Sequence, residues 1–239
     1  MEKRELIFIG TVHRDPDGMM LLLQLLRYEN PVQVTVEVSP YGLCFRKRKG
    51  RRLLRVLVRR CRRIARAADS PLRRWGQLQA ISVQIGFPFE YRASLRYCRD
   101  ARASLSCLDL SSHSMQLIQG EWEDLVSTRN LGTLCQQNPE DSKAVRARTY
   151  ALASRLMKEK DAARSFASVR GWKTDVDWQK REAFLAAGLD RIWATMEKGR
   201  LAYIGGWQHL LCATGSGTLF ERLAHLYPRR ILLADYSQL

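Results

Sequence analysis

Residues 6–15 read LIFIGTVHRD, and in this segment four apolar residues lead into a glycine and then to His13. A short apolar run of this kind is typical of a buried β-strand. The next residues, DPDG at 15–18, are typical of a turn and of helix N-caps, and residues 19–28 then have helical character. Residues 32–38 (VQVTVEV) are rich in β-branched side chains and predict a second strand. Strand, helix and strand in this order predict parallel strands of an α/β sheet.

The same patterns recur along the rest of the chain. Further strands are predicted at residues 104–108, 201–205 and 231–234. Helices are predicted at residues 52–68, 72–85, 90–103, 177–198 and 215–226. Between the third and fourth strands, residues 111–179 are mostly helical and polar, with breaks at Asn138-Pro139 and Gly171. The sequence therefore predicts one α/β domain over residues 1–239, with a central, mainly parallel sheet flanked by helices and carrying a helical insertion.

Composition places the chain among folded proteins of a reducing compartment. The apolar fraction is 46%, and the six cysteines are scattered without a CxxC pair, which is a poor disulfide or zinc framework. The N-terminal apolar run is shorter than the core of a signal peptide. The stretch MMLLLQLL at residues 19–26 falls well short of the ~20 residues that span a bilayer. We expect a cytoplasmic protein without a transmembrane segment.

Positive charge is concentrated in one segment. The chain has a net charge of +16, and between Arg46 and Arg74 basic residues crowd with no acid before Asp69. Such a field attracts nucleic acid, an anionic membrane surface or acidic ligands. No aromatic residue lies in this segment, so it offers no platform for base stacking. Residues 46–74 are therefore predicted either to bind nucleic acid or an anionic membrane, as a non-catalytic binding module, or to form a solvated helix face.

Polar residues follow four of the predicted strands: His13, Glu37, Asp109 and His209. Ligands of open parallel sheets bind at the carboxyl ends of the strands, so these residues predict a site. Glu37 lies in a strand that should be apolar, and a buried carboxylate is costly unless it is paired or binds a ligand. His13 has the alternative of a turn residue, and Asp109 that of a helix N-cap. The other two histidines lie in helical stretches and are expected in surface or packing roles: His113 and His225.

Two of these residues end GxxH motifs. Gly10-Thr11-Val12-His13 and Gly206-Trp207-Gln208-His209 each follow a predicted strand, and Glu37 lies between them. This pattern resembles the TraB/PrgY/Tiki family, which belongs to a superfamily with erythromycin esterases and the haem-binding ChaN proteins. Further segments resemble the family in order along nearly the whole chain: residues 90–93 (EYRA), 107–109 (CLD) and 181–185 (REAFL). The chain departs from the family at Asp109-Leu110, where an Asp-Arg pair is usual.

The resemblance implies a metal-dependent hydrolase that cleaves peptide, amide or ester bonds. In Tiki-like members the two histidines and the glutamate act on a metal, which here implies the ligands His13, Glu37 and His209. Two imidazoles and a carboxylate leave coordination positions open for water and substrate. Zinc, manganese, cobalt or iron are compatible with this divalent site.

Erythromycin-esterase-like relatives imply a second version of the site. There a histidine acts as general base toward water, held by a carboxylate, with no obligatory metal. In both versions Arg92 would bind an anionic group or stabilise developing negative charge, while Glu90 and Asp109 would orient the groups that contact substrate. Arg181 either assists them or lies on a solvated helix face. The ChaN branch implies a third alternative, the binding of haem or iron through an exposed residue.

Overall fold

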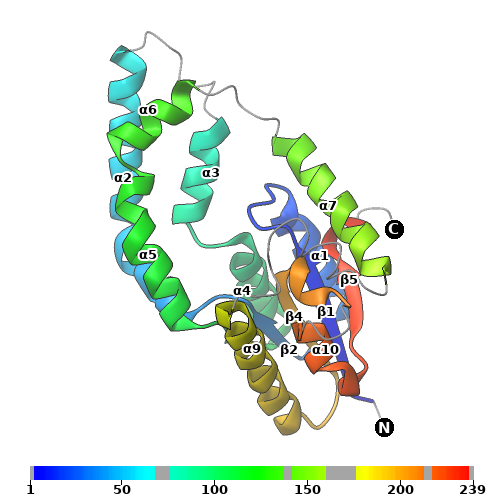
Figure 1. The fold of residues 1–239 in the computed structure, drawn as a ribbon. Coiled ribbons are helices and arrows are strands. Elements are labelled where there is room, and N and C mark those ends of the chain that lie inside the picture. Colours follow the sequence, from blue (N-terminus) through cyan, green and yellow to red (C-terminus); the bar gives the residue numbers. More distant parts are fainter. Residues whose placement is uncertain (1–2, 68–75, 137–141, 160–175, 213–216, 237–239) are drawn as a thin grey trace. The chain divides into compact units, whose positions relative to one another are not determined.

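The computed structural model describes residues 3–67, 76–136, 142–159, 176–212 and 217–236 of the chain (Figure 1). Contacts divide the chain into two compact units. The first, which we call the sheet unit, comprises Met1–Val38, Phe89–Asp109 and Arg146–Leu239. The second, which we call the helical unit, comprises Ser39–Pro88 and Leu110–Val145. The prediction that residues 1–239 act as a single domain stays a prediction.

The sheet unit contains a five-stranded parallel sheet with the order β3-β2-β4-β1-β5. Its strands are β1 (Glu5–Thr11), β2 (Gln33–Val36), β3 (Ser104–Cys107), β4 (Arg200–Gly206) and β5 (Arg229–Leu232). The predicted α/β class and all five predicted strands are confirmed. The β4 strand lies between β1 and β2, so the first two strands are parallel without being neighbours. Local sequence patterns indicate strands, but tertiary packing decides which strands become neighbours.

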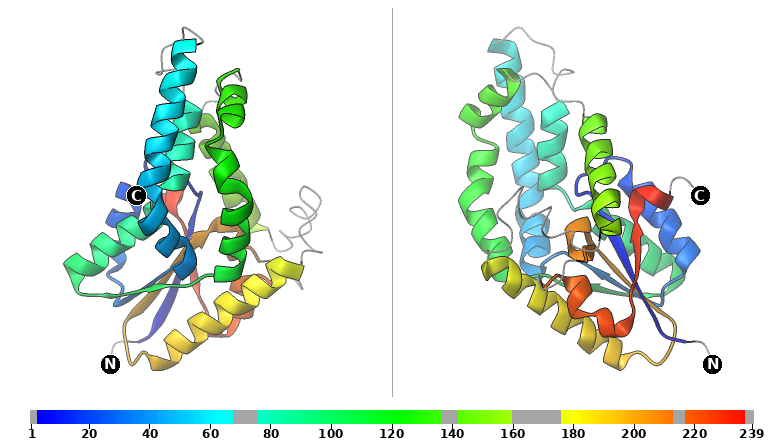
Figure 2. Two further views of the ribbon diagram at one scale, coloured as in Figure 1. Left: turned by 90° about the vertical axis from the view of Figure 1, so that its left-hand side faces the viewer. Right: turned by 45° about the vertical axis from the view of Figure 1, so that its right-hand side comes forward.

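Helices cover both faces of this sheet (Figure 2). In β1, Leu6 and Phe8 belong to a core cluster with Leu185 and Leu189 of α9 (Val176–Thr195) and with residues of α10 (Leu219–Arg222). Side chains alternate along a strand, so Ile7, which is also fully buried, faces the other side. There α1 (Gly18–Glu29) and α4 (Phe89–Ala101) pack together. The remaining elements are α7 (Ser142–Lys158), which continues from one unit into the other, η3 (Trp207–Leu210), η4 (Ala224–Leu226) and α11 (Leu233–Tyr236).

The helical unit is built from α2 (Pro40–Ala67), α3 (Gly76–Ile85), α5 (Ser111–Leu125) and α6 (Thr128–Gln136). One stripe of α2, including Leu57 and Cys61, is buried in a cluster with Ile118 and Trp122 of α5. The spacing of these residues is that of one face of a helix. Most arginines of α2 are exposed and lie outside this stripe.

Two predicted helices have different bounds in the structure. Helix α2 begins at Pro40, twelve residues before the predicted start, because Pro40 suits a first helical turn and the following Gly42 and Gly50 do not interrupt the helix. The helix expected at 215–226 is the short α10 followed by η4. Thr218 and Glu221 form a capping box, which sets the start of α10. The breaks predicted at Asn138-Pro139 and Gly171 lie outside the described residues.

Two further sequence predictions concern cysteines and membrane spans. The five cysteines whose side chains are described form no disulfide: Cys44, Cys61, Cys98, Cys107 and Cys212. Within the described ranges, no helix is both long enough and apolar enough to cross a membrane.

Phe8 is fully buried on β1, an inner strand of the sheet, and packs edge-on against Tyr203, with ring centroids 5.3 Å apart. We expect Phe8→Ala to lower the free energy of unfolding by about 3–5 kcal/mol, because it leaves a cavity in the core. The control is Phe184→Ala on α9, where the ring is 36% exposed and the loss should stay below about 1 kcal/mol. Urea denaturation measures both variants, and equal losses would show that Phe8 is not a core residue.

Candidate functional site

The four residues predicted at strand ends do lie at one edge of the sheet. Their strands are neighbours in the order β3-β2-β4-β1, and each residue follows its strand within three positions. Glu37 continues the pairing of β2 with β4, because its backbone N–H donates to the carbonyl of Ile204 at 2.8 Å. The carboxyl edge of the parallel sheet therefore gathers the predicted residues: His13, Glu37, Asp109 and His209.

The Glu37 carboxylate is the centre of this edge. Its side chain is only 3% exposed, yet three donors satisfy it. Arg181 Nη2 and His209 Nε2 donate to Oε1 at 2.5 and 3.1 Å, and the backbone N–H of Gly206 donates to Oε2 at 2.6 Å. Burial alone would raise the pKa of Glu37, but the positive charges of His209 and Arg181 hold it well below its usual value. Glu37 is therefore a buried, ionised group.

His209 is fully enclosed and hydrogen-bonded at both ring nitrogens. Nδ1 lies 2.5 Å from Glu182 Oε1 and Nε2 lies 3.1 Å from Glu37 Oε1. The ring stacks on Trp178, with centroids 4.8 Å apart and planes within 9°. Burial opposes the charged form, but Glu182 and Glu37 outweigh it and raise the pKa of His209 to about 10. At neutral pH His209 is an imidazolium that donates from both nitrogens, so it has no lone pair to offer as a base.

Arg181 of α9 forms ion pairs with the carboxylates that follow β2 and β3. Its guanidinium makes a bidentate pair with Asp109, with Nε–Oδ1 at 2.7 Å and Nη2–Oδ2 at 2.8 Å, and Nη2 also reaches Glu37. The two carboxylates raise the pKa of Arg181 despite its burial. Arg181 thus supplies the arginine partner of Asp109 that is missing at Leu110. Of the two alternatives for Arg181, the solvated helix face is wrong.

His13 differs from His209 because its ring is 54% exposed. Nδ1 lies 2.8 Å from Oε1 of the buried Glu90, and the Thr11 hydroxyl lies 3.0 Å from the same oxygen. Burial on its inner side disfavours the charged ring, but the hydrogen bond and charge of Glu90 raise the pKa of His13 above 6.5. Among the described residues, Nε2 has no hydrogen-bond partner. A turn positions this ring, since the next residue, Arg14, has a left-handed backbone with φ of 69°.

Two glycines let the strand ends approach one another. A Cβ on Gly205 would lie 2.5 Å from Oε2 of Glu37 and 2.5 Å from the hydroxyl oxygen of Tyr203. A Cβ on Gly206 would lie 3.1 Å from Nε2 of His13. The pair Gly205-Gly206 is therefore needed where Glu37, Tyr203 and His13 converge. Burial and the charge of Glu37 raise the pKa of Tyr203 well above 10, so this hydroxyl stays protonated.

Arg92 does not join these groups. It is exposed on α4, two residues after Glu90, and residues two apart in a helix point to different sides. No described contact joins Arg92 to this edge of the sheet, and its predicted role there stays a prediction. The alternative for Asp109 as a helix N-cap is wrong, because Leu110 occupies the cap position of α5.

Sequence reasoning missed Glu182, which is fully buried and holds both His209 and the backbone N–H of Leu219. A signal was present, since Glu182 precedes Leu185, Ala186 and Leu189 at spacings of three, four and seven residues. That spacing places it on the buried face of α9. The other two histidines behave as expected: His113 lies in α5 and His225 is exposed beside Asp190.

The predicted metal ligands do not fit a metal in this arrangement. Both nitrogens of His209 donate to carboxylates, and Glu37 is already held by an arginine, a histidine and a backbone N–H. Within the part of the chain that the structure describes, no group of three or more His, Cys, Asp or Glu residues is arranged to hold a metal ion. A metal would have to replace hydrogen bonds that Glu37 and His209 already make.

The chain was compared with protein-family models, with curated proteins and with solved structures, and none of the three comparisons gives a match. The resemblance to the TraB/PrgY/Tiki family and the cofactor it implies therefore stay predictions.

Replacing Arg181 should destabilise the buried network of charged side chains formed by Glu37, Asp109, Arg181 and His209. We expect Arg181→Met to lower the free energy of unfolding by about 3–5 kcal/mol, because the carboxylates of Asp109 and Glu37 lose a buried partner. Arg191→Met on the same helix is the matched control, since Arg191 is exposed and, among the described residues, hydrogen-bonds only to the carbonyl of Ala187. Its loss should be below about 0.5 kcal/mol by urea denaturation. Similar losses for the two variants would contradict the network.

The charge of His209 gives a prediction about pH. Its pKa in the folded chain lies above the ordinary value of 6.5, so the stabilisation it provides is complete below pH 6.5 and is lost as pH rises through about 10. Nitrogen NMR of the imidazole rings, assigned with His209→Gln, should show His209 doubly protonated at pH 8. A neutral ring at pH 8 would contradict the hydrogen-bond pattern.

Proposed function

We propose that the chain is a hydrolase in which His13 acts as general base toward water and Glu90 holds it in place. The observation that carries the proposal is the position of His13. Its Nδ1 is paired with a buried carboxylate, while Nε2 is open beside the backbone of Gly206. A histidine with one nitrogen held by a carboxylate and the other open to water or substrate has the geometry of a general base.

The side-chain amide of Gln208 lies near this base. A Cβ on Gly206 would lie 3.1 Å from His13 Nε2 and 3.6 Å from Gln208 Oε1, so both side chains border Gly206. Gln208 is partly exposed, and within the described ranges its amide makes no hydrogen bond to protein. An amide N–H can stabilise the oxyanion that forms when water attacks a carbonyl. This arrangement suits peptide, amide and ester substrates alike.

In this proposal the buried charges position the reacting groups and do not react. Glu37 accepts a hydrogen bond from the backbone N–H of Gly206 and another from His209. His209 lies in the η3 turn that also carries Gln208, so these bonds position that turn. Arg181 and Asp109 hold Glu37 in turn. Glu37 and His209 already use their side-chain polar atoms in these hydrogen bonds, so the proposed reaction is carried by His13 and water. The haem or iron alternative stays a prediction, and no described contact favours it.

Activity should depend on His13 and on pH. With p-nitrophenyl acetate and a panel of fluorogenic peptide amides, we expect His13→Gln to lower kcat/KM by about 10²–10⁴. The control is His225→Gln, an exposed histidine outside the site, which should leave kcat/KM unchanged. The base must be neutral, so activity should be lost as pH falls through the raised pKa of His13.

Glu90→Gln should lower that pKa and shift the acidic limb of the pH profile to lower pH, with a smaller maximum rate. The proposal is contradicted if His13→Gln retains full activity, or if the wild-type chain turns over no substrate of the panel.

A further inference from the structure

The helical unit carries a surface that the proposed hydrolase does not use. Helix α2 has twelve Lys and Arg residues and no Asp or Glu in its 28 positions. Within the described ranges, none of these cations forms an ion pair with a carboxylate. Two of them serve the fold: Arg46 donates to the carbonyls of Gly42 and Gly86, and Arg60 donates to that of Val126. The others leave a large uncompensated charge on the exposed side.

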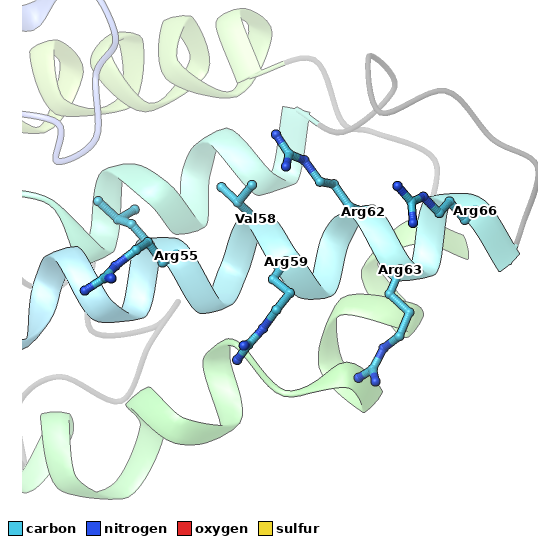
Figure 3. Close-up of a pocket in the computed structure, with 7 residues that line it drawn as sticks. Arg55, Val58, Arg59, Arg62, Arg63 and Arg66 are labelled. Carbon is cyan, nitrogen blue, oxygen red and sulfur yellow. The ribbon is translucent and has the colours of Figure 1, made fainter.

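Four arginines form a row along that side: Arg55, Arg59, Arg62 and Arg66. Their spacing of four, three and four residues keeps them within about 60° of one another around the helix and extends over about 16 Å. All four are exposed, and with Arg63, Leu54 and Val58 they line a shallow hollow (Figure 3). In that view Arg62 and Arg66 extend to one side of α2, and Arg59 to the other. We call these four residues the arginine row.

The apolar side of α2 is already occupied, which argues against a membrane surface as the partner. An interfacial helix buries its apolar face in lipid. In α2 that face, with Leu57 and Cys61, is packed against Ile118 and Trp122 of α5. Among the described residues that line the hollow, Leu54 and Val58 are the apolar ones, and Arg63 adds a further cation. The side of the helix that is open to a partner is therefore mainly cationic.

The arginine row is suited to bind phosphate groups that are regularly spaced along a rigid ligand. Guanidinium groups bind phosphate oxygens bidentately, and contacts to a phosphate backbone carry no sequence information. Among the described residues, no aromatic side chain lines the hollow, so the described part of this surface offers unpaired bases nothing to stack on. We propose that the arginine row binds the phosphate backbone of double-stranded nucleic acid without reading its sequence. This binding is independent of the hydrolase site in the sheet unit.

Fluorescence anisotropy with two unrelated 20-base-pair DNA duplexes tests the proposal. We expect the full chain to bind both with equal affinity and to lose affinity as salt rises from 50 to 200 mM. For four phosphate contacts, the slope of log K against log salt should be about −3.6. The triple variant R55Q/R59Q/R62Q should bind at least about tenfold more weakly at 100 mM salt, and its slope should be smaller by about 2.7.

Two matched triple variants distinguish an effect of the arginine row from an effect of the total charge of the chain. R96Q/R99Q/R191Q removes the same charge from exposed arginines of the sheet unit and should bind like the wild type. R55K/R59K/R62K keeps the charge of the row and should retain most of the salt slope. Circular dichroism reports the folding of each variant. The salt slope of the wild type and the lysine variant test the proposal even if the glutamine variant does not fold.

Several results would overturn the proposal. These are an absence of binding at 50 mM salt, an equal loss in the row variant and the sheet-unit variant, and a strong difference between the two sequences. Tighter binding to phosphatidylserine-containing vesicles than to either duplex would also overturn it, and would assign the row to a membrane.

Discussion

The ionised carboxylate of Glu37, buried at the edge of a parallel sheet, is the constraint on which the rest of the site depends. A charge in that position is tolerated only when it is paired and fully hydrogen-bonded. Arg181, His209 and the backbone N–H of Gly206 meet that requirement, and each comes from an element far from β2 in the sequence. The hydrogen bonds to this one carboxylate therefore hold α9, the end of β4 and the η3 turn in fixed positions relative to one another.

This constraint separates two kinds of histidine that share the same GxxH motif. His209 is enclosed between two carboxylates and stays charged, so its role is to hold structure. His13 is half exposed, has one carboxylate partner and keeps an open nitrogen. The two motifs look alike in the sequence, but the number of carboxylates around each ring gives them different chemistry. The open ring is the one that can take a proton from water.

The sequence predicted the strands and the strand-end residues because both depend on local patterns. A β-branched run that contains Glu37 already indicates a buried charge in need of a partner. Which partner it finds depends on tertiary packing, because Arg181 lies 144 residues after Glu37 and on another element, α9. The predicted role of Arg92, which is exposed on α4, stays a prediction. The order of the strands could not be deduced from patterns within single elements.

We infer that hydrogen bonds among protein groups, rather than a metal, satisfy Glu37 and His209. Elemental analysis by mass spectrometry, on untagged protein purified without added metal and without chelator, tests this inference. We expect far less than one equivalent of zinc, manganese, cobalt or iron per chain, with no difference between the wild type and His209→Gln. One equivalent of any of these metals in the wild type, lost in His209→Gln, would contradict it.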